Sequence, residues 1–184
     1  MVVLPQAKSH LLSRIDHFVR DRIVFASRVI SAHVSTKIKP LGDIILVFAR
    51  SSVVEQCLVD AWKRDGKRFE VICVGGETFK EGKRLAESLL SQGISTSYAP
   101  LSSLAAVLHR VSLVLLGTAS LLSDGALYSR AGTATVAMMA HARKVPVIVC
   151  CETYKFSERV RLEGVGGNEL GELTNKVPMP VCVC

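Results

Sequence analysis

Small polar and cationic side chains follow apolar runs of this chain at the points where helical patterns begin. Ser51 and Ser52 come just after the apolar run 44–48, with Arg50 beside them. The N-terminus of a helix favours anions because its unpaired N–H groups and the positive end of its dipole point outward. Neighbouring loops could add further polar groups. The candidate ligand-binding residues are Arg50, Ser51, Ser52, Asp124, Arg130, Thr133 and Lys155. A sugar phosphate or a nucleotide would suit them; ordinary helix capping beside a solvated arginine is the alternative.

Several widespread nucleotide-binding and catalytic motifs are absent from the sequence. A dinucleotide-binding loop needs G-x-G-x-x-G after the first strand, but Ala49, Arg50, Ser51 and Ser52 stand there. The chain also contains no Walker A loop, no G-x-S-x-G, no H-E-x-x-H and no EF-hand loop. These absences argue against the functions that such motifs carry.

Histidine and cysteine offer the remaining routes to chemistry. The five histidines are scattered without ligand spacing, so we expect surface or helix-packing roles. The six cysteines form no C-x-x-C pair, which favours small buried hydrophobes over a disulfide scaffold. Cys150 and Cys151 end an apolar run, but no histidine base is close in sequence, so a core role is favoured over a nucleophile. We expect no metal site and no cofactor.

Apolar runs alternate with helical patterns through the middle of the chain. Strands are expected at 44–48, 69–74, 95–99, 113–116 and 147–151, and helices at about 51–65, 80–92, 102–109 and 133–143. This alternation indicates a parallel sheet covered on both faces. The expected fold class is α/β, a Rossmann-like parallel sheet with helices on both faces. Around the helix 80–92, the side chains expected to face inward are Phe79, Leu85, Leu89 and Leu90.

The loops at the carboxyl ends of the strands should carry the ligands and partners of such a sheet. The stretch 113–133 is expected to run as a strand, a polar loop with Asp124 and Gly125, and the start of a helix. Residues 152–160 are expected to form a polar-aromatic loop or a short helix, and residues 164–167 a turn. Residues 175–184 could add one last edge strand.

A basic helical segment is expected before the sheet. Between residues 9 and 34, apolar residues recur every three or four positions, which indicates an amphipathic helix or two short ones, with Ser9 as N-cap and Pro40 after its end. The apolar stripe must pack on the following domain or on another chain. We expect a helical segment at 1–40, the end of an N-terminal helical region, and an α/β domain at 41–184, with truncation at the C-terminus as a possibility.

The net charge of +7 is unevenly distributed along the chain. Residues 1–40 hold seven basic and two acidic side chains and therefore carry +5 of it. A basic helical segment suits a nucleic acid or an acidic protein, and a solvated helix face is the plainer alternative. Aromatic residues do not alternate with the basic ones as in RNA-binding modules, so a nucleic-acid partner is not favoured.

The composition fits a single soluble domain. Of the 184 residues 49% are hydrophobic, and the mean hydropathy is +0.34. The longest apolar runs have about five residues, against the ~20 that a membrane span needs. Residues 1–5 are too short for the apolar part of a signal peptide. We expect a cytoplasmic protein without a membrane partner.

Five segments carry a resemblance to a known family. They are RIDHFVRDRIVFASRVIS at 14–31, GDIILVF at 42–48, LLGTASLLSDGALYSRAGT at 115–133, CCETYKFSERV at 150–160 and NEL at 168–170. In unbroken order they cover roughly residues 12–172, and they resemble the delta subunits of eukaryotic translation initiation factor 2B. CCETYKF-x-ERV with a following NEL points to delta rather than to the related alpha and beta subunits.

The same superfamily includes sugar-phosphate isomerases such as methylthioribose-1-phosphate isomerase. The resemblance places the catalytic cysteine of those enzymes on Ala49 and their catalytic aspartate on Ala119. Methyl groups neither attack nor transfer protons, so this isomerase activity is not expected. A ligand-binding allosteric module and, less favoured, an active isomerase are kept as alternatives.

The resemblance implies a non-catalytic regulatory and assembly subunit of the guanine-nucleotide exchange factor for initiation factor 2. Its regulatory core senses phosphorylation of the alpha subunit of initiation factor 2. The implied partners are the beta, alpha, gamma and epsilon subunits of initiation factor 2B and initiation factor 2 itself, especially its alpha subunit. The chain is shorter than the family at both ends. The candidate interface residues are Glu152, Tyr154, Lys155, Phe156, Arg159, Asn168 and Glu169.

Overall fold

A parallel five-stranded sheet lies at the centre of the computed structural model, which describes residues 4–76, 80–160 and 181–183. The strand order is β3-β2-β1-β4-β7, and all neighbouring strands are parallel. The strands are β1 (Leu41–Phe48), β2 (Arg68–Gly75), β3 (Thr96–Pro100), β4 (Leu113–Gly117) and β7 (Val147–Cys150). All five predicted strands are therefore present, with ends that differ by at most three residues.

Helices cover both faces of this sheet, as predicted. One face packs against α2 (Ala26–Lys37), α3 (Ser52–Lys63) and α4 (Glu81–Ser91). The other packs against α5 (Leu104–Val107), its flanking 3-10 turns η2 (Leu101–Ser103) and η3 (Leu108–Arg110), and α6 (Thr133–Ala142). Along β1, Ile45 and Val47 belong to the first core and Leu46 and Phe48 to the second. Because successive side chains of a strand point to opposite faces, a strand buried on both faces is continuously apolar.

A second, smaller sheet lies where a plain loop was expected between β4 and α6. Its order is β8-β5-β6-β9, from β8 (Phe156–Ser157), β5 (Ser120–Leu122), β6 (Leu127–Arg130) and β9 (Val181–Val183). The strands β5 and β6 form an antiparallel hairpin around Asp124 and Gly125, so the loop prediction is wrong there. Gly125 has φ +86°, a left-handed conformation that glycine adopts without strain.

Two segments near the C-terminus, both covered by the sequence predictions, contribute strands to the second sheet. The segment after β7 begins with a short 3-10 helix, η4 (Thr153–Lys155), which agrees with the predicted short helix. The strand β8 follows it and was not predicted. The edge strand expected at 175–184 is seen as β9, which pairs antiparallel with β6 at the edge of the second sheet. The turn expected at 164–167 and residues 175–180 lie outside the described residues.

The N-terminal segment is one continuous helix that begins earlier than predicted. It consists of α1 (Leu4–Phe18), a wider π-helical stretch η1 (Val19–Phe25) and α2, which ends before Pro40. Ser9 is not the N-cap: it lies inside α1, where its hydroxyl donates to the Gln6 carbonyl oxygen at 2.9 Å. The predicted start of the helix at Ser9 is therefore wrong. The sequence before Ser9 contains no other N-cap residue that would mark the earlier start.

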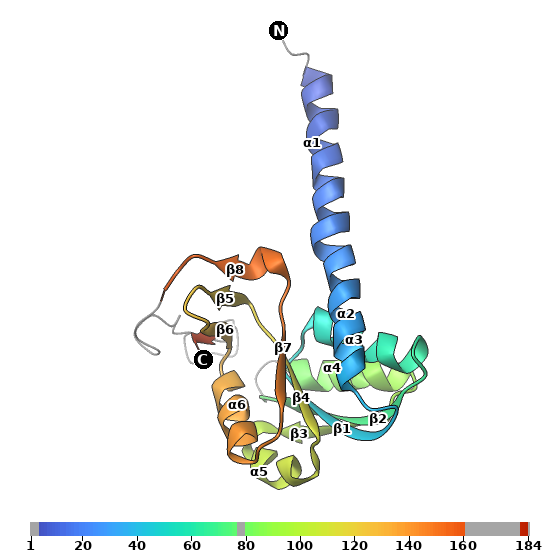
Figure 1. Ribbon diagram of the computed structural model, residues 1–184, viewed down its shortest axis with the longest axis vertical. Helices are drawn as coiled ribbons and strands as arrows, with labels where there is room; N and C mark the ends of the chain where they lie inside the picture. The colour runs from blue at the N-terminus through green and yellow to red at the C-terminus, as the bar shows by residue number, and fades with distance from the viewer. Residues whose placement is uncertain (1–3, 77–79, 161–180, 184) are drawn as a thin grey trace.

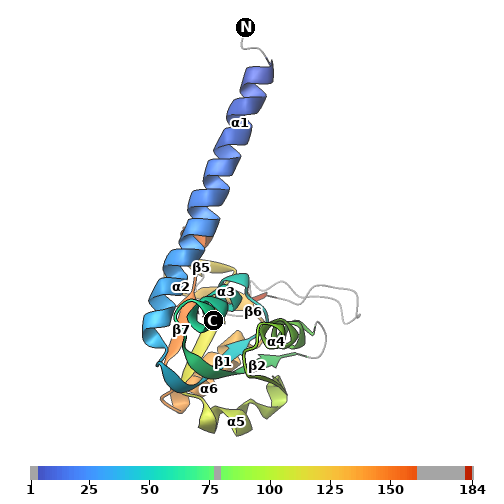
Figure 2. The ribbon, with the colours of Figure 1, turned by 90° about the vertical axis from the view of Figure 1, so that its right-hand side faces the viewer.

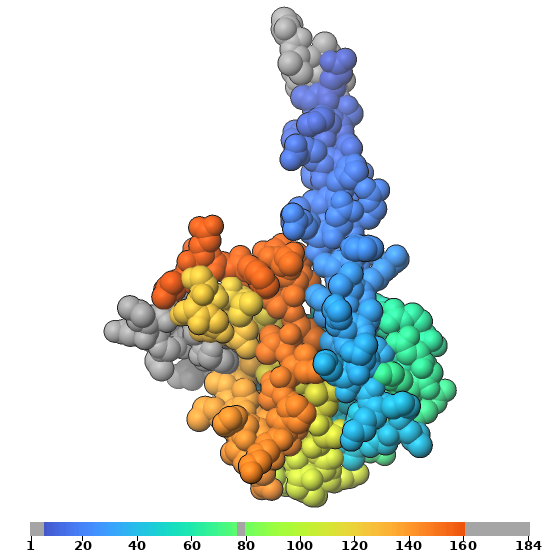
Figure 3. All heavy atoms as spheres, in the orientation of Figure 1, coloured from blue at the N-terminus to red at the C-terminus, as the bar shows by residue number. Residues whose placement is uncertain are grey.

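Only the last part of this helix packs on the domain. Ile30 and Val34 of α2 contact the core, whereas residues 4–25, which we call the arm, project away from the sheet in two perpendicular views (Figures 1 and 2). The space-filling view shows the upper part of the arm standing clear of the rest of the molecule, while its lower part lies beside the segment that follows β7 (Figure 3). Its large apolar side chains are exposed, among them Leu11, Leu12, Ile15, Phe18 and Val19.

Two further burial predictions differ from the structure. Leu85 and Leu89 of α4 are buried as expected, but Leu90 is 53% exposed because it lies on the solvent side of the helix. Phe79 lies outside the described residues. In the part of the chain that the structure describes, no helix has the length and apolar character required to cross a membrane.

Candidate functional site

A cavity of about 320 Å³ opens at the carboxyl ends of β1 and β4. This is the edge of the sheet at which ligands of open α/β folds bind. Five of the seven candidate ligand-binding residues line it, namely Arg50, Ser51, Ser52, Arg130 and Lys155. They come from the β1–α3 turn and the start of α3, from β6 and from η4, so the fold brings together residues more than a hundred positions apart.

The β1–α3 turn presents its polar groups to this cavity. Ala49 has φ +57°, a left-handed conformation that is costly for residues with a side chain, and its N–H donates to the Val74 carbonyl oxygen at 2.8 Å. Ser51 then occupies the N-cap position of α3 with an extended backbone, but its side chain makes no capping hydrogen bond. The alternative of ordinary side-chain capping therefore does not describe Ser51.

A close approach between β4 and α3 shapes the floor of the cavity. A Cβ atom added to Gly117 would lie 2.4 Å from Ser51 Oγ and 2.5 Å from Ser51 Cβ. Glycine at the end of β4 is therefore what allows the N-terminus of α3 to approach this strand.

The two arginines at the cavity are paired with carboxylates of the protein. Arg50 Nε lies 3.1 Å from Glu55 Oε2, and Arg130 Nη2 lies 2.9 Å from Glu81 Oε1. Both glutamates sit in the first turn of a helix, α3 or α4. An incoming anion would have to compete with these carboxylates, which lowers the positive potential that the cavity offers.

The third cation, Lys155, forms a more buried pair. Its Nζ lies 2.8 Å from Glu152 Oε2, and the Tyr154 hydroxyl donates to Glu152 Oε1 at 3.1 Å. Glu152 is only 2% exposed, so its carboxylate depends on these two partners. Burial and the neighbouring Glu152 carboxylate raise the pKa of the Tyr154 hydroxyl above its ordinary value.

The other two candidates do not line the cavity. Thr133 is buried at the start of α6, where its hydroxyl donates to the Arg130 carbonyl oxygen at 2.7 Å. Asp124 lies in the β5–β6 turn, where its Oδ1 accepts from the Ala126 N–H at 3.0 Å. The hairpin, which was not predicted, carries Asp124 away from the sheet edge. The cavity instead includes Thr118 and Ser129, which the sequence pattern did not single out.

No reactive side chain of the kind an isomerase needs lines the cavity. Ala49 and Ala119, the two positions implied by the resemblance, both lie on its surface, and among its described lining residues there is no cysteine, histidine, aspartate or glutamate. This arrangement can bind an anion through hydroxyl, amide and cationic groups, but it holds no nucleophile or general base of those types.

The cysteines behave as core residues where they are described. Cys57, Cys73 and Cys150 are buried, as predicted, and Cys151 is half-buried. Burial raises the pKa of the Cys73 thiol to about 12 and also raises that of Cys151, so neither is poised as a thiolate. Within the described ranges no three histidine, cysteine or acidic side chains are grouped to hold a metal ion.

The candidate interface residues divide between surface and interior. Tyr154 and Phe156 are 42% and 58% exposed, and Arg159 is exposed as well. Glu152 is buried and forms an ion pair with Lys155, so it is not available to a partner. Asn168 and Glu169 lie outside the described residues. The ring of Phe18 in the arm lies 6.3 Å from that of Tyr154.

Comparison with known proteins places these features in a family. The model of the initiation factor 2 subunit family matches residues 3–177. The chain is 40% identical to translation initiation factor eIF2B subunit delta of Schizosaccharomyces pombe over 176 residues, which is 96% of this chain and 37% of that protein. It is also 40% identical over 165 residues to the delta subunit of Dictyostelium discoideum, covering 90% of this chain and 26% of that protein.

Solved structures of the same kind share the fold. The tetrameric eIF2B-beta2-delta2 complex from C. thermophilum contains a chain that superposes with a TM-score of 0.86 at 32% identity, covering 97% of this chain and 58% of that one. For eIF2B delta from Chaetomium thermophilum the TM-score is 0.75 at 36% identity, with 83% and 56% covered. This chain thus spans between 26% and 58% of the length of these four relatives. With a family match over nearly its whole length, the chain belongs to the initiation factor 2 subunit family.

Proposed function

We propose that this chain acts as a non-catalytic regulatory and assembly subunit of an exchange factor for translation initiation factor 2, in the cytoplasm. The observation that carries the proposal is an exposed apolar surface formed by the arm and the loop beside it. We call this the arm–loop surface. Its residues are Leu12, Ile15, Phe18, Val19, Tyr154 and Phe156.

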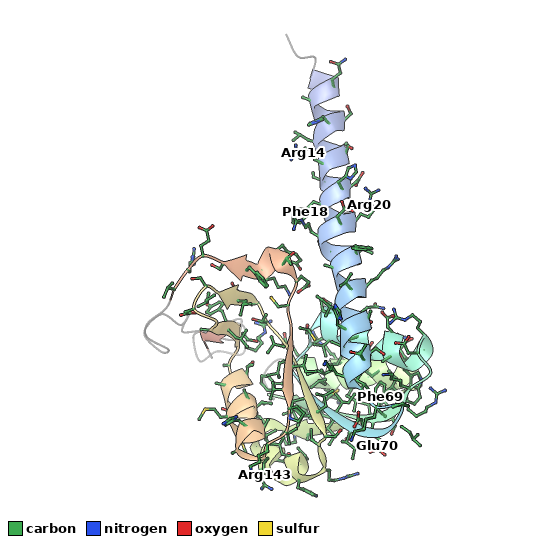
Figure 4. The ribbon with its side chains drawn as sticks, in the orientation of Figure 1. Arg14, Phe18, Arg20, Phe69, Glu70 and Arg143 are labelled. Atoms are coloured by element: carbon green, nitrogen blue, oxygen red, sulfur yellow. The ribbon has the colours of Figure 1, made fainter. Side chains whose placement is uncertain are left out.

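The arm–loop surface has the character of a protein interface. Single exposed apolar residues are common on proteins, but several on one helix face next to the exposed ring of Tyr154 are not. Aromatic and arginine side chains anchor protein interfaces. Figure 4 shows Phe18 and Arg14 projecting from the side of the arm that faces the 152–157 loop, with Arg20 on the opposite side. The basic arm would suit an acidic partner surface.

The partners proposed are other subunits of the exchange factor, beta first and then alpha, gamma and epsilon. The relatives at 40% identity are named as delta subunits of eIF2B, and a similar fold occurs in a beta2-delta2 complex, which supports this choice. Within such an assembly the chain would contribute to the core that responds to phosphorylation of the alpha subunit of initiation factor 2.

We expect Phe156→Ala to weaken binding of the beta subunit by about 1–3 kcal/mol, or roughly 5- to 150-fold in Kd, because its exposed ring would be an interface anchor. The measurement is co-expression with the tagged beta subunit, followed by titration of purified proteins. Leu90→Ala is the matched control, since Leu90 is similarly exposed but lies on α4. Equal affinities for the two variants, or recovery of the wild-type chain without any other subunit, would contradict the proposal.

The cavity supports a second candidate function, the binding of a small phosphorylated ligand as an allosteric signal. It combines the uncapped Ser51 side chain, the N-terminus of α3 and three cationic groups. We expect a sugar phosphate such as ribose 5-phosphate to raise the melting temperature by a few degrees at millimolar concentration, and Arg130→Ala to remove this shift. Arg143→Ala, at the far end of the domain in Figure 4, is the control. An unchanged melting temperature for the wild-type chain would remove this candidate.

A further inference from the structure

Two serines of α2, one helical turn apart, are buried against α3 and bound to aspartates. Ser31 Oγ donates to Asp60 Oδ2 at 2.7 Å, and Ser35 Oγ donates to Asp65 Oδ2 at 2.5 Å. Both serine residues are buried. Asp60 belongs to α3, and Asp65 lies two residues beyond its end. These bonds join segments that are 29 and 30 residues apart in sequence.

The two aspartates are themselves held in place. Gln56 Nε2 donates to Asp60 Oδ1 at 2.6 Å, and Arg64 Nε donates to Asp65 Oδ1 at 2.9 Å. Hydrogen bonds from Arg64 and then from Ser35 lower the pKa of Asp65 to about 2, so the carboxylate is ionised at neutral pH. Because other hydrogen bonds hold each carboxylate in place, it cannot follow a moving hydroxyl, which makes each serine bond sensitive to the position of α2.

A lysine closes the end of the same helix. Lys67 Nζ donates to the carbonyl oxygens of Ser35 and Ile38, at the C-terminus of α2. The last carbonyls of a helix lack partners within it, and a cation there also meets the negative end of the helix dipole. Lys67 therefore adds a third polar attachment between α2 and the segment after α3.

Apolar contacts also join α2 to the domain, and they do not set a register by themselves. Val34 and Ile38 are buried and Ile30 packs beside them. Apolar contacts tolerate small rotations and shifts, whereas buried polar pairs are matched in only one arrangement. A shift of α2 by one turn, about 5.4 Å, would move one serine into the place of the other and leave one buried hydroxyl without an acceptor, and a rotation of α2 about its axis would turn both hydroxyls away from the aspartates.

We propose that Ser31, Ser35, Asp60, Asp65 and Lys67 form a polar latch that fixes the rotation and tilt of α2, and through it the direction of the arm. Because α1, η1 and α2 are one continuous helix, any rotation at α2 turns the apolar face of the arm relative to the loop. These residues would be positioning residues for the arm–loop surface, and in that role the inference rests on the proposed function.

The experiment measures the direction of the arm in the whole chain. Spin labels on unnatural amino acids at Ser13 and Ser102, both exposed, report the distance distribution between the arm and the domain by pulsed electron resonance. We expect Ser31→Ala/Ser35→Ala to at least double the width of that distribution while the helix content stays unchanged. The same variant should lower beta-subunit affinity about tenfold.

Two controls separate the latch from a general loss of packing. Ser27→Ala removes a hydroxyl of the same helix whose bond goes to the Ile23 carbonyl oxygen, so the distribution should keep its width. Thr36→Val removes a second hydroxyl of α2, whose bond goes to the His33 carbonyl oxygen of the same helix, and should also leave the width unchanged. If the double serine variant does not fold, Ser35→Ala alone is measured and should give a smaller broadening.

The outcomes also distinguish the latch from the proposed function. A distribution as narrow in Ser31→Ala/Ser35→Ala as in Ser27→Ala would overturn the latch, whatever the partner does. If the wild-type chain binds no subunit but the serine variant still broadens the distribution, the proposed function fails while the latch stands. A broadened distribution with full beta-subunit affinity would overturn the positioning role.

Discussion

Replacing Lys155 with methionine is expected to destabilise the fold by about 3–5 kcal/mol, which is the range found when one partner of a buried ion pair is removed. The methionine fills a similar volume, so the loss comes from the Glu152 carboxylate, which is 2% exposed and would keep only the Tyr154 hydroxyl as a partner. The measurement is the free energy of unfolding from urea titration at neutral pH.

The compensating change provides the control for Lys155→Met. Glu152→Gln removes the charge but keeps an oxygen that can accept from Tyr154, so the double variant should recover most of the lost stability. If Lys155→Met unfolds at the wild-type urea concentration, the pair does not hold the loop together. In that case Lys155 would be available to bind a ligand, whereas its ion pair with Glu152 competes with ligand binding.

Gly117→Ala is expected to cost about 1–3 kcal/mol and to distort the cavity, because the new Cβ would overlap Ser51. The overlap involves Ser51 Cβ at 2.5 Å as well as Oγ at 2.4 Å, so rotating the serine side chain does not relieve it. The end of β4 and the N-terminus of α3 must therefore move apart. The measurement is again the free energy of unfolding, together with the sugar-phosphate shift in melting temperature.

A second-site change tests whether this overlap is the cause. Ser51→Gly removes both overlapping atoms, and Ser51 makes no side-chain capping bond, so the single variant should cost little. Combined with Gly117→Ala it should restore most of the stability, as a non-additive pair. Strictly additive losses in the two variants would show that the close approach of β4 to α3 is not what requires glycine at position 117.

The central sheet was predictable because its signals are local in sequence. Each inner strand is buried on both faces and therefore continuously apolar, and the helices between the strands end near Gly66 and Gly93, which adopt left-handed conformations. Ser51 and Ser52 follow the first strand directly, so their place at the carboxyl edge followed from the strand itself. For the same reason Arg50 lines the cavity with them, whereas Arg130 and Lys155 are brought there by β6 and η4.

The second sheet was not predictable in this way. β5 has three residues and β6 four, too short for a period of two to stand out, and they are completed by β8 and β9 from a distant part of the chain. The missed hairpin is also why Asp124 was placed at the site and why Thr118 and Ser129 were overlooked. Leu90 fits the apolar spacing of α4 and is exposed all the same, because the face that a helix buries depends on its neighbours.

The sequence by itself determined the α/β class, the order of the central elements and the family, since all three depend on local pattern and on motifs within short segments. Only the tertiary structure decided which charges are paired, which helix face stays open and how the arm is held. Arg130 donates a hydrogen bond to Glu81, 49 residues away in the sequence, and Ser31 donates one to Asp60, 29 residues away. Such long-range polar contacts leave no periodic trace in sequence, because they depend on how whole elements pack against one another.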